Sequence, residues 1–155
     1  LKVMADSVLF LREQGIKSVA QLDVLIQERA DKRQELQEKI KLIDDKSAQL
    51  SAVMEHAHTI KQFKEIYKYH KENPNDKQFE NEYSREISLY KVAATELLKT
   101  YKKLPDTKEI LTELDSLHEK KNTLMKEYSE TKTNIDDLFI IRKNFEQYMG
   151  KEMER

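Results

Sequence analysis

The sequence predicts an all-α protein, an elongated antiparallel three-helix bundle or coiled coil with long helices and a short N-terminal helix. Only two glycines and two prolines occur among 155 residues, so the backbone has few places to turn. Charged residues make up 37% and hydrophobic residues 38%, a balance typical of coiled coils. Apolar residues recur at steps of three and four, and no segment alternates with a period of two. These patterns predict helices and no strands.

Three short segments interrupt the helical pattern: 14–18, 73–76 and 104–107. Gly15 is a typical residue after the end of a helix, and Ser18 with Gln21 forms a capping box that starts the next one. Pro74 lies in an Asn-Pro-Asn-Asp turn signal, and Pro105 precedes residues that can cap a new helix. The chain is therefore expected to be a single elongated helical domain. Its predicted helices span residues 6–14, 19–72, 77–103 and 107–149.

The longest predicted helix could also divide in two. A break near the polar segment Asp44–Ser47 would fold residues 19–72 into two helices. No glycine or proline supports that break, so a continuous helix is favoured.

Short connections predict that the third helix runs antiparallel to both neighbours, which gives a three-helix bundle over about residues 46–130. The last helix would then run parallel to the second. Residues 19–45 and 133–149 would project at opposite ends, each with an apolar seam. Such seams need a cover, because each buried aliphatic side chain is worth roughly 1.5 to 3 kcal/mol. The short first helix, a break in the second helix or a second copy of the chain could supply it, and we predict self-association. The candidate residues are Leu22, Ile26, Leu36, Ile40, Ile43, Ile135, Leu138, Phe145 and Met149.

Arginines interrupt these seams at Arg29, Arg33 and Arg142. Burying an unpaired guanidinium is costly, although the stem of the side chain can cover apolar surface while its head stays in water. The arginines therefore indicate thinly covered seams. Alternatively they fix the register of a partner helix, as polar residues do in coiled coils.

No residue pattern points to catalysis. The chain has no cysteine, and His56 and His58 point away from each other on a helix, so they cannot chelate a metal together. Adjacent carboxylates such as Asp44 and Asp45 diverge on a helix and read as a solvated face. We expect no catalytic residue, no metal site, no cofactor and no small-molecule substrate. Enzyme activity is not expected in this segment.

The net charge and the hydropathy limit which classes of binding partner are expected. The net charge of −1 gives the whole chain no bulk attraction for nucleic acid or membrane, and no apolar run is long enough to span a bilayer. The absence of cysteine fits a reducing compartment, so a cytoplasmic location is expected. The sequence opens at Leu1 without an initiator methionine, which suggests part of a longer protein.

One local patch can bind an anionic partner. Lysines at steps of three, four and three place four ammonium groups on one helix face, and such a stripe can follow a phosphate backbone. Tyr69 is a candidate to stack on an unpaired base, whereas Tyr67 is expected to face the core. The alternative is an ordinary solvated lysine stripe, since Glu65 lies nearby. The DNA-contact candidates are Lys61, Lys64, Lys68, Lys71 and Tyr69.

Several stretches resemble a known family. They are residues 9–22 (LFLREQGIKSVAQL), 66–70 (IYKYH), 86–94 (EISLYKVAA), 124–128 (LMKEY) and 142–144 (RKN). Together they are similar to the region that follows the nuclease domain in relaxases, the mobilization proteins of conjugative elements from Gram-positive bacteria. In that family a catalytic tyrosine nicks DNA with the help of a metal held by histidines. This chain has no clustered histidines, so none of its tyrosines is assigned that role.

The resemblance implies a bacterial, non-catalytic, helical C-terminal domain of a relaxase. Such a domain would support conjugative DNA transfer by binding DNA, by dimerising or by docking on the transfer machinery, while the parent protein nicks DNA. The alternative is a generic coiled-coil scaffold that binds helical proteins and has no role with DNA.

Overall fold

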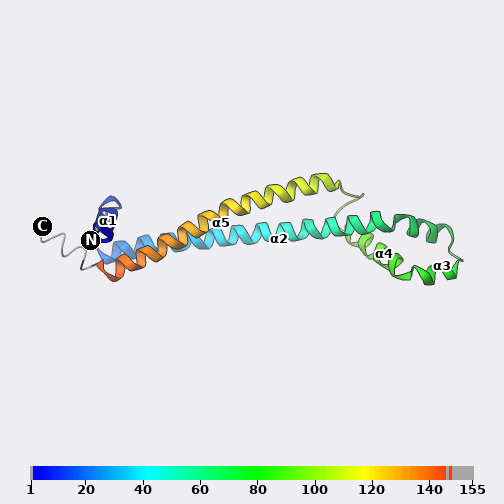
Figure 1. Ribbon diagram of the computed structural model, residues 1–155, viewed down its shortest axis with the longest axis horizontal. Coiled ribbons are helices and arrows are strands. Elements are labelled where there is room, and N and C mark those ends of the chain that lie inside the picture. Colours follow the sequence, from blue (N-terminus) through cyan, green and yellow to red (C-terminus); the bar gives the residue numbers. More distant parts are fainter. Residues whose placement is uncertain (1, 146, 148–155) are drawn as a thin grey trace. The chain divides into compact units, whose positions relative to one another are not determined.

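A computed structural model describes residues 2–145 and 147, with side chains from residue 6 onward. Helices account for nearly all of these residues, and no strand occurs among them. The predicted all-α fold with long helices and a short N-terminal helix is confirmed (Figure 1). The helices are α1 (Lys2–Glu13), α2 (Val19–Glu72), α3 (Lys77–Glu82), α4 (Ser84–Leu98) and α5 (Thr107–Lys143).

The first predicted turn forms as expected. Gly15 has a positive φ of 68°, a conformation that glycine adopts without steric cost, and α1 ends just before it. The N–H of Ile16 then donates to the carbonyl of Leu11 at 2.8 Å, which closes the end of the helix. At the start of α2, Ser18 Oγ accepts from the N–H of Gln21 at 3.2 Å. The Gln21 side chain in turn accepts from the N–H of Lys17 at 2.6 Å.

Helix α2 is continuous from Val19 to Glu72, with no break at 44–47. The favoured alternative is therefore the one that the structure adopts. Because nothing in this segment removes a backbone donor or forces a left-handed φ, the helical hydrogen bonds continue through its polar residues.

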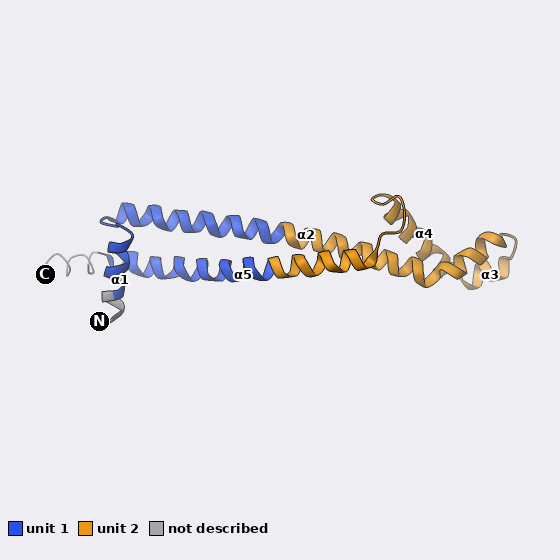
Figure 2. Cartoon of the chain, turned by 90° about the horizontal axis from the view of Figure 1, so that it is seen from above, with its two compact units in different colours: residues 1–41, 121–155 blue, residues 42–120 orange. Residues whose placement is uncertain are grey.

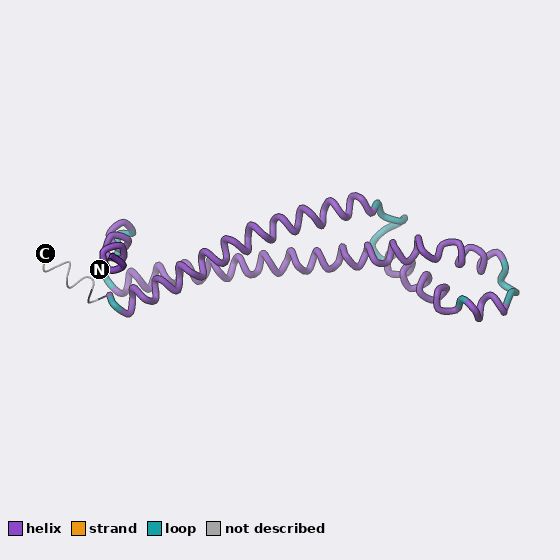
Figure 3. Tube along the Cα trace, in the orientation of Figure 1, coloured by secondary structure: helices purple, strands orange, loops and turns teal. Residues whose placement is uncertain are grey.

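The predicted helix 77–103 is instead two helices, and it ends earlier. Tyr83 lies between α3 and α4 with φ −110° and ψ 23°, outside the helical region, although its N–H still donates to the carbonyl of Phe79 at 2.9 Å. Helix α4 ends at Leu98, and residues 99–106 form a link without helical structure (Figure 3). The polar run Lys99–Lys103 gives these residues little apolar surface with which to pack as a helix.

The chain divides into two compact units, residues 1–41 with 121–155 and residues 42–120 (Figure 2). In unit 1 the first part of α2 runs antiparallel to the end of α5. Three contacts between side chains establish this direction, because residues later in α2 meet residues earlier in α5. The contacts are Asp23 with Arg142, Arg29 with Asn134, and Lys32 with Glu127.

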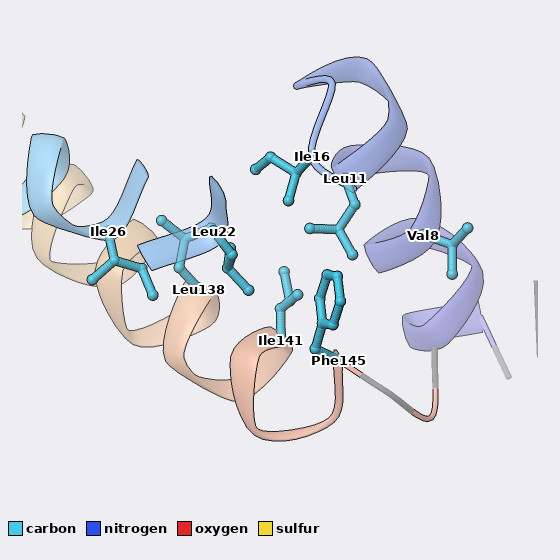
Figure 4. Close-up of a cluster of buried hydrophobic side chains, with 8 residues drawn as sticks. All are labelled: Val8, Leu11, Ile16, Leu22, Ile26, Leu138, Ile141 and Phe145. Carbon is cyan, nitrogen blue, oxygen red and sulfur yellow. The ribbon is translucent and has the colours of Figure 1, made fainter. Parts of the chain in front are cut away.

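The core of unit 1 lies where α1 meets the end of this helix pair. Figure 4 shows apolar side chains from α1, α2 and α5 pointing into one cluster. Leu11 and Leu22 are fully buried, and Leu138 is 1% exposed. Their companions in the cluster are Val8, Ile16, Ile26, Ile141 and Phe145.

In unit 2, the rest of α2 runs antiparallel to α3 and α4. Tyr67 stacks on Tyr90 with ring centroids 4.1 Å apart, and Tyr69 meets Phe79 nearer the turn. The beginning of α5 also reaches α2, since Lys46 Nζ lies 3.6 Å from Glu113. The buried apolar residues of this unit are Leu50, Ala57, Ile87, Ala93, Leu97 and Ile110.

The expected direction of the last helix was wrong. Helix α5 runs antiparallel to α2, not parallel. The link 99–106 does not reverse the chain, so α5 continues in the direction of α4. The sequence prediction treated this link as a hairpin turn, the usual geometry of short helix connections. In unit 1, residues 19–41 consequently pack against residues 121–143, so the predicted projecting ends do not exist there.

Candidate nucleic-acid interface

The four candidate lysines lie on one face of α2 within unit 2. Lys61, Lys64, Lys68 and Lys71 are all exposed. At 3.6 residues per turn they occupy about 80° of the helix circumference over a length of about 15 Å. The four lysines are therefore exposed on one face of a continuous helix. We call this set the lysine stripe.

Among the described residues, several exposed lysines form no ion pair, members of the stripe as well as others such as Lys91 and Lys126, whereas some lysines do. Lys39, Lys46 and Lys99 each lie within 3.6 Å of a glutamate oxygen. Within residues 6–145, by contrast, no ion pair joins Lys61, Lys64 or Lys68 to an acidic side chain. Their positive charge is thus available to an external anion.

Lys71 is the member of the stripe that contacts an aromatic ring. Its Nζ lies over the ring of Tyr67, 5.6 Å from the centroid, which is within the range of a cation–π contact. The same ring stacks on Tyr90 at an interplanar angle of 15°. Tyr67 therefore belongs to the packing between α2 and α4, as predicted.

Tyr69 is 40% exposed but is engaged on two sides. Its hydroxyl donates to Asp76 Oδ2 at 2.8 Å, and its ring centroid lies 4.2 Å from that of Phe79. The hydrogen bond to Asp76 raises the pKa of Tyr69. The pKa of Asp76 is lowered by the N–H of Phe79 and then by the Tyr69 hydroxyl. Tyr69 consequently fastens the turn between α2 and α3, a role that its sequence position did not reveal.

The self-association candidates lie inside the chain's own fold where the structure describes them. In unit 1, Leu22, Ile26 and Leu36 are buried on α2, and Ile135, Leu138 and Phe145 are buried opposite them. Ile40 and Ile43 are half-buried, and Met149 lies outside the described residues. The seams therefore no longer require a second copy as their cover.

The seam arginines find partners within unit 1. Arg142 donates through Nε to Asp23 Oδ1 and through Nη2 to Asp23 Oδ2, and Arg29 Nε donates to Asn134 Oδ1 at 3.2 Å. The hydrogen bond with Arg142 lowers the pKa of Asp23 and raises that of Arg142. Arg33 is half-buried. Asp23 was not predicted, because its pairing with Arg142 depends on the antiparallel direction of α5.

A shallow groove in unit 1 was not predicted. It has a volume of about 340 Å³ and lies between α1 and α5. Ile140, 55% exposed, lines it, and its neighbour Phe139 is 54% exposed. The lining residues are Asp6, Ser7, Phe10, Asn134, Asp137, Leu138, Ile140 and Ile141. The spacing of apolar residues at steps of three and four did not identify Phe139 and Ile140, since both lie outside the apolar seam of α5.

The histidines do not converge. His58 and His118 are exposed, His56 is half-buried, and the ring of His70 lies 6.2 Å from that of Tyr67. Among the described residues, no group of three histidine or acidic side chains is placed to hold a metal ion. None of the described helices is both long enough and apolar enough to cross a bilayer.

Comparison with known proteins returned no match to any family model, curated protein or solved structure.

Proposed function

We propose that this chain is a non-catalytic helical domain that binds DNA through the lysine stripe of α2. The observation that carries the proposal is that four exposed lysines share one face of a continuous helix, and that three of them form no ion pair among the described residues. Phosphate contacts by lysine supply most of the sequence-independent affinity of proteins for DNA. A line of four such groups on a rigid helix suits that task.

The proposed setting is the helical C-terminal region of a bacterial relaxase, in the cytoplasm. This setting rests on the resemblance of residues 9–22, 66–70 and 86–94 to that family. There the domain would hold DNA beside the nuclease domain of its parent protein, which would carry out the nicking. In cells, the parent protein with Lys61, Lys64 and Lys68 changed to glutamine is expected to transfer DNA less often than the wild type. Equal transfer frequencies would count against this setting.

The stripe itself is tested with the purified chain. We expect Lys61→Gln, Lys64→Gln and Lys68→Gln, made together, to weaken DNA binding and flatten its dependence on salt. With four phosphate contacts, affinity for duplex DNA falls about 150-fold between about 50 and about 200 mM salt, and with one contact it falls about 3.5-fold. Fluorescence anisotropy of a labelled oligonucleotide measures both slopes.

A matched control has the same change in net charge. Lys39→Gln, Lys46→Gln and Lys99→Gln remove three lysines that already pair with glutamates. The control is expected to keep most of the salt slope of the wild type. If the control and the stripe variant lose affinity equally, net charge and not the stripe governs binding, and the proposal is wrong.

A second candidate function is a protein-interaction scaffold with no role with DNA. The exposed pair Phe139 and Ile140 beside the groove of unit 1 favours it, because neighbouring exposed apolar side chains often mark interaction sites. Absence of DNA binding together with concentration-dependent association, abolished by Phe139→Ser and Ile140→Ser, would select this candidate.

A further inference from the structure

We infer that the lysine stripe takes the backbone of duplex DNA and does not bind single strands by stacking their bases. This inference rests on the proposed function and specifies the form of DNA that the same site accepts. It follows from what the aromatic rings beside the stripe contact, and from the width and length of the stripe.

Single-strand binders combine basic residues with aromatic rings that offer a free face to each unpaired base. Four residues with aromatic rings are close to the stripe in sequence: Phe63, Tyr67, Tyr69 and His70. Tyr67 lies only about 40° around the helix from Lys71, but Tyr90 stacks on its ring and Lys71 Nζ lies over it. Its ring is therefore committed to the packing of α2 on α4.

The other three rings lie on other faces of the helix. Phe63 and Tyr69 lie at least about 80° and His70 at least about 100° around the helix from every stripe lysine. Tyr69 is held by Asp76 and Phe79, Phe63 is half-buried, and His70 is half-buried near Tyr67. A nucleotide strand that follows the lysines thus meets ammonium groups without a stacking platform. The ring of Tyr69, which was expected to stack on an unpaired base, packs on Phe79.

The dimensions of the stripe match a regular backbone. The lysines extend over about 15 Å of helix, and a length of about 15 Å along a duplex passes about four phosphates of one strand. Exposed Glu65 and Glu72 border the stripe on its solvent side, which confines the positive surface to a narrow line. A narrow line of four charges suits the fixed ridge of one duplex strand. A flexible single strand would have to be held in that extended path without stacking, and would lose its freedom for no compensating contact.

The test compares two ligands on the unmodified chain, so it depends on no variant that fails to fold. Anisotropy is measured with a labelled 20-base-pair duplex and with a single-stranded oligo-dT of about the same length, across a salt series. We expect the duplex to bind about tenfold more tightly, with a slope of log affinity against log salt of about −3.6. Tyr69→Leu is expected to leave the affinity for oligo-dT unchanged.

The outcomes separate this inference from the proposed function. If oligo-dT binds as tightly as the duplex or more so, and Lys61, Lys64 and Lys68 are needed for both, the stripe binds DNA but the duplex inference is overturned. A loss of oligo-dT binding in Tyr69→Leu, with the helix content unchanged by circular dichroism, would overturn it as well. If neither ligand binds, or binding ignores the three lysines, the proposed function itself fails.

Discussion

The Asp76 carboxylate accepts two hydrogen bonds at the turn between α2 and α3. One carboxylate oxygen accepts from the N–H of Phe79 at 3.0 Å and caps α3, and the other accepts from the Tyr69 hydroxyl. Both hydrogen bonds favour the ionised carboxylate and lower its pKa. Unit 2 therefore gains stability from this residue only while the carboxylate is charged.

The titration of Asp76 gives a prediction at this scale. Because its pKa is lower in the folded than in the unfolded chain, its contribution is complete above the unfolded pKa and is lost as the pH falls through the folded pKa. We expect Asp76→Asn to reduce the loss of stability between about pH 5 and pH 2.5, at the cost of lower stability at neutral pH. Urea unfolding followed by circular dichroism measures this. The exposed Asp115→Asn is the control, and an identical pH dependence in Asp76→Asn and the wild type would contradict the assignment.

At the scale of the elements, α2 is the helix on which both units are built. It presents Leu22, Ile26 and Leu36 to α5 in unit 1, and Leu50 and Ala57 inward in unit 2. Residues on its outer side, such as Leu42 at 69% exposed, contribute little to either core. Position around the helix, more than residue type, decides what each leucine does.

Two leucines of α2 test this statement with the same substitution. Leu22→Ala removes a fully buried side chain and is expected to destabilise the chain by about 2 to 5 kcal/mol. Leu42→Ala removes an exposed one and is expected to change stability by no more than about 0.5 kcal/mol. Urea denaturation provides both values. Equal effects would mean that the seam of α2 is not buried as described.

The elements also show how far sequence reasoning reaches. Apolar spacing and the signals at Gly15 and Ser18 predicted the start and the continuity of α2, and the turn signal at 73–76 predicted its end, because these features act over a few residues. The kink at Tyr83 was missed, since no glycine or proline marks it. The direction of α5 was also missed. It depends on how residues 99–106 carry the chain, a matter of long-range packing that local patterns do not encode.

For the candidate site, too, local spacing predicted some features and the tertiary fold determined the others. The exposure and common face of the lysine stripe followed directly from helical spacing. What the neighbouring rings contact did not, because the partners of Tyr67 and Tyr69 lie on α4 and α3. Asp23 and Arg142 are 119 residues apart in sequence, so their ion pair required the tertiary fold.

For the molecule as a whole, the apolar seams can be buried either within one chain or between copies of the chain. The buried cluster of unit 1 comes from α1, α2 and α5 of the same chain, with Ile16 between α1 and α2 and Phe145 just after α5. Self-association through these residues would therefore require them to separate first. Association through exposed side chains such as Phe139 remains a separate prediction.

The dependence of stability on protein concentration tests whether the seams are closed within one chain. If the seams are closed within one chain and the exposed Phe139 and Ile140 do not associate, the urea midpoint should be the same at about 1 and about 100 μM protein, because only association makes stability depend on concentration. Leu138→Ala should lower that midpoint equally at both concentrations. A midpoint that rises with concentration in the wild type, and less so in Leu138→Ala, would show that the seam is shared between copies.

The division of the chain into two units also bears on the order of folding. In unit 2, Tyr69 and Asp76 are seven residues apart, whereas Arg29 and Asn134 in unit 1 are separated by 105. Closing a long loop costs more chain entropy than closing a short one, and contacts between distant residues slow folding. All of unit 2 lies within the segment that separates Arg29 from Asn134. Once unit 2 has formed, unit 1 has a much shorter free loop to close, so the hairpin end at Asp76 is the natural nucleus.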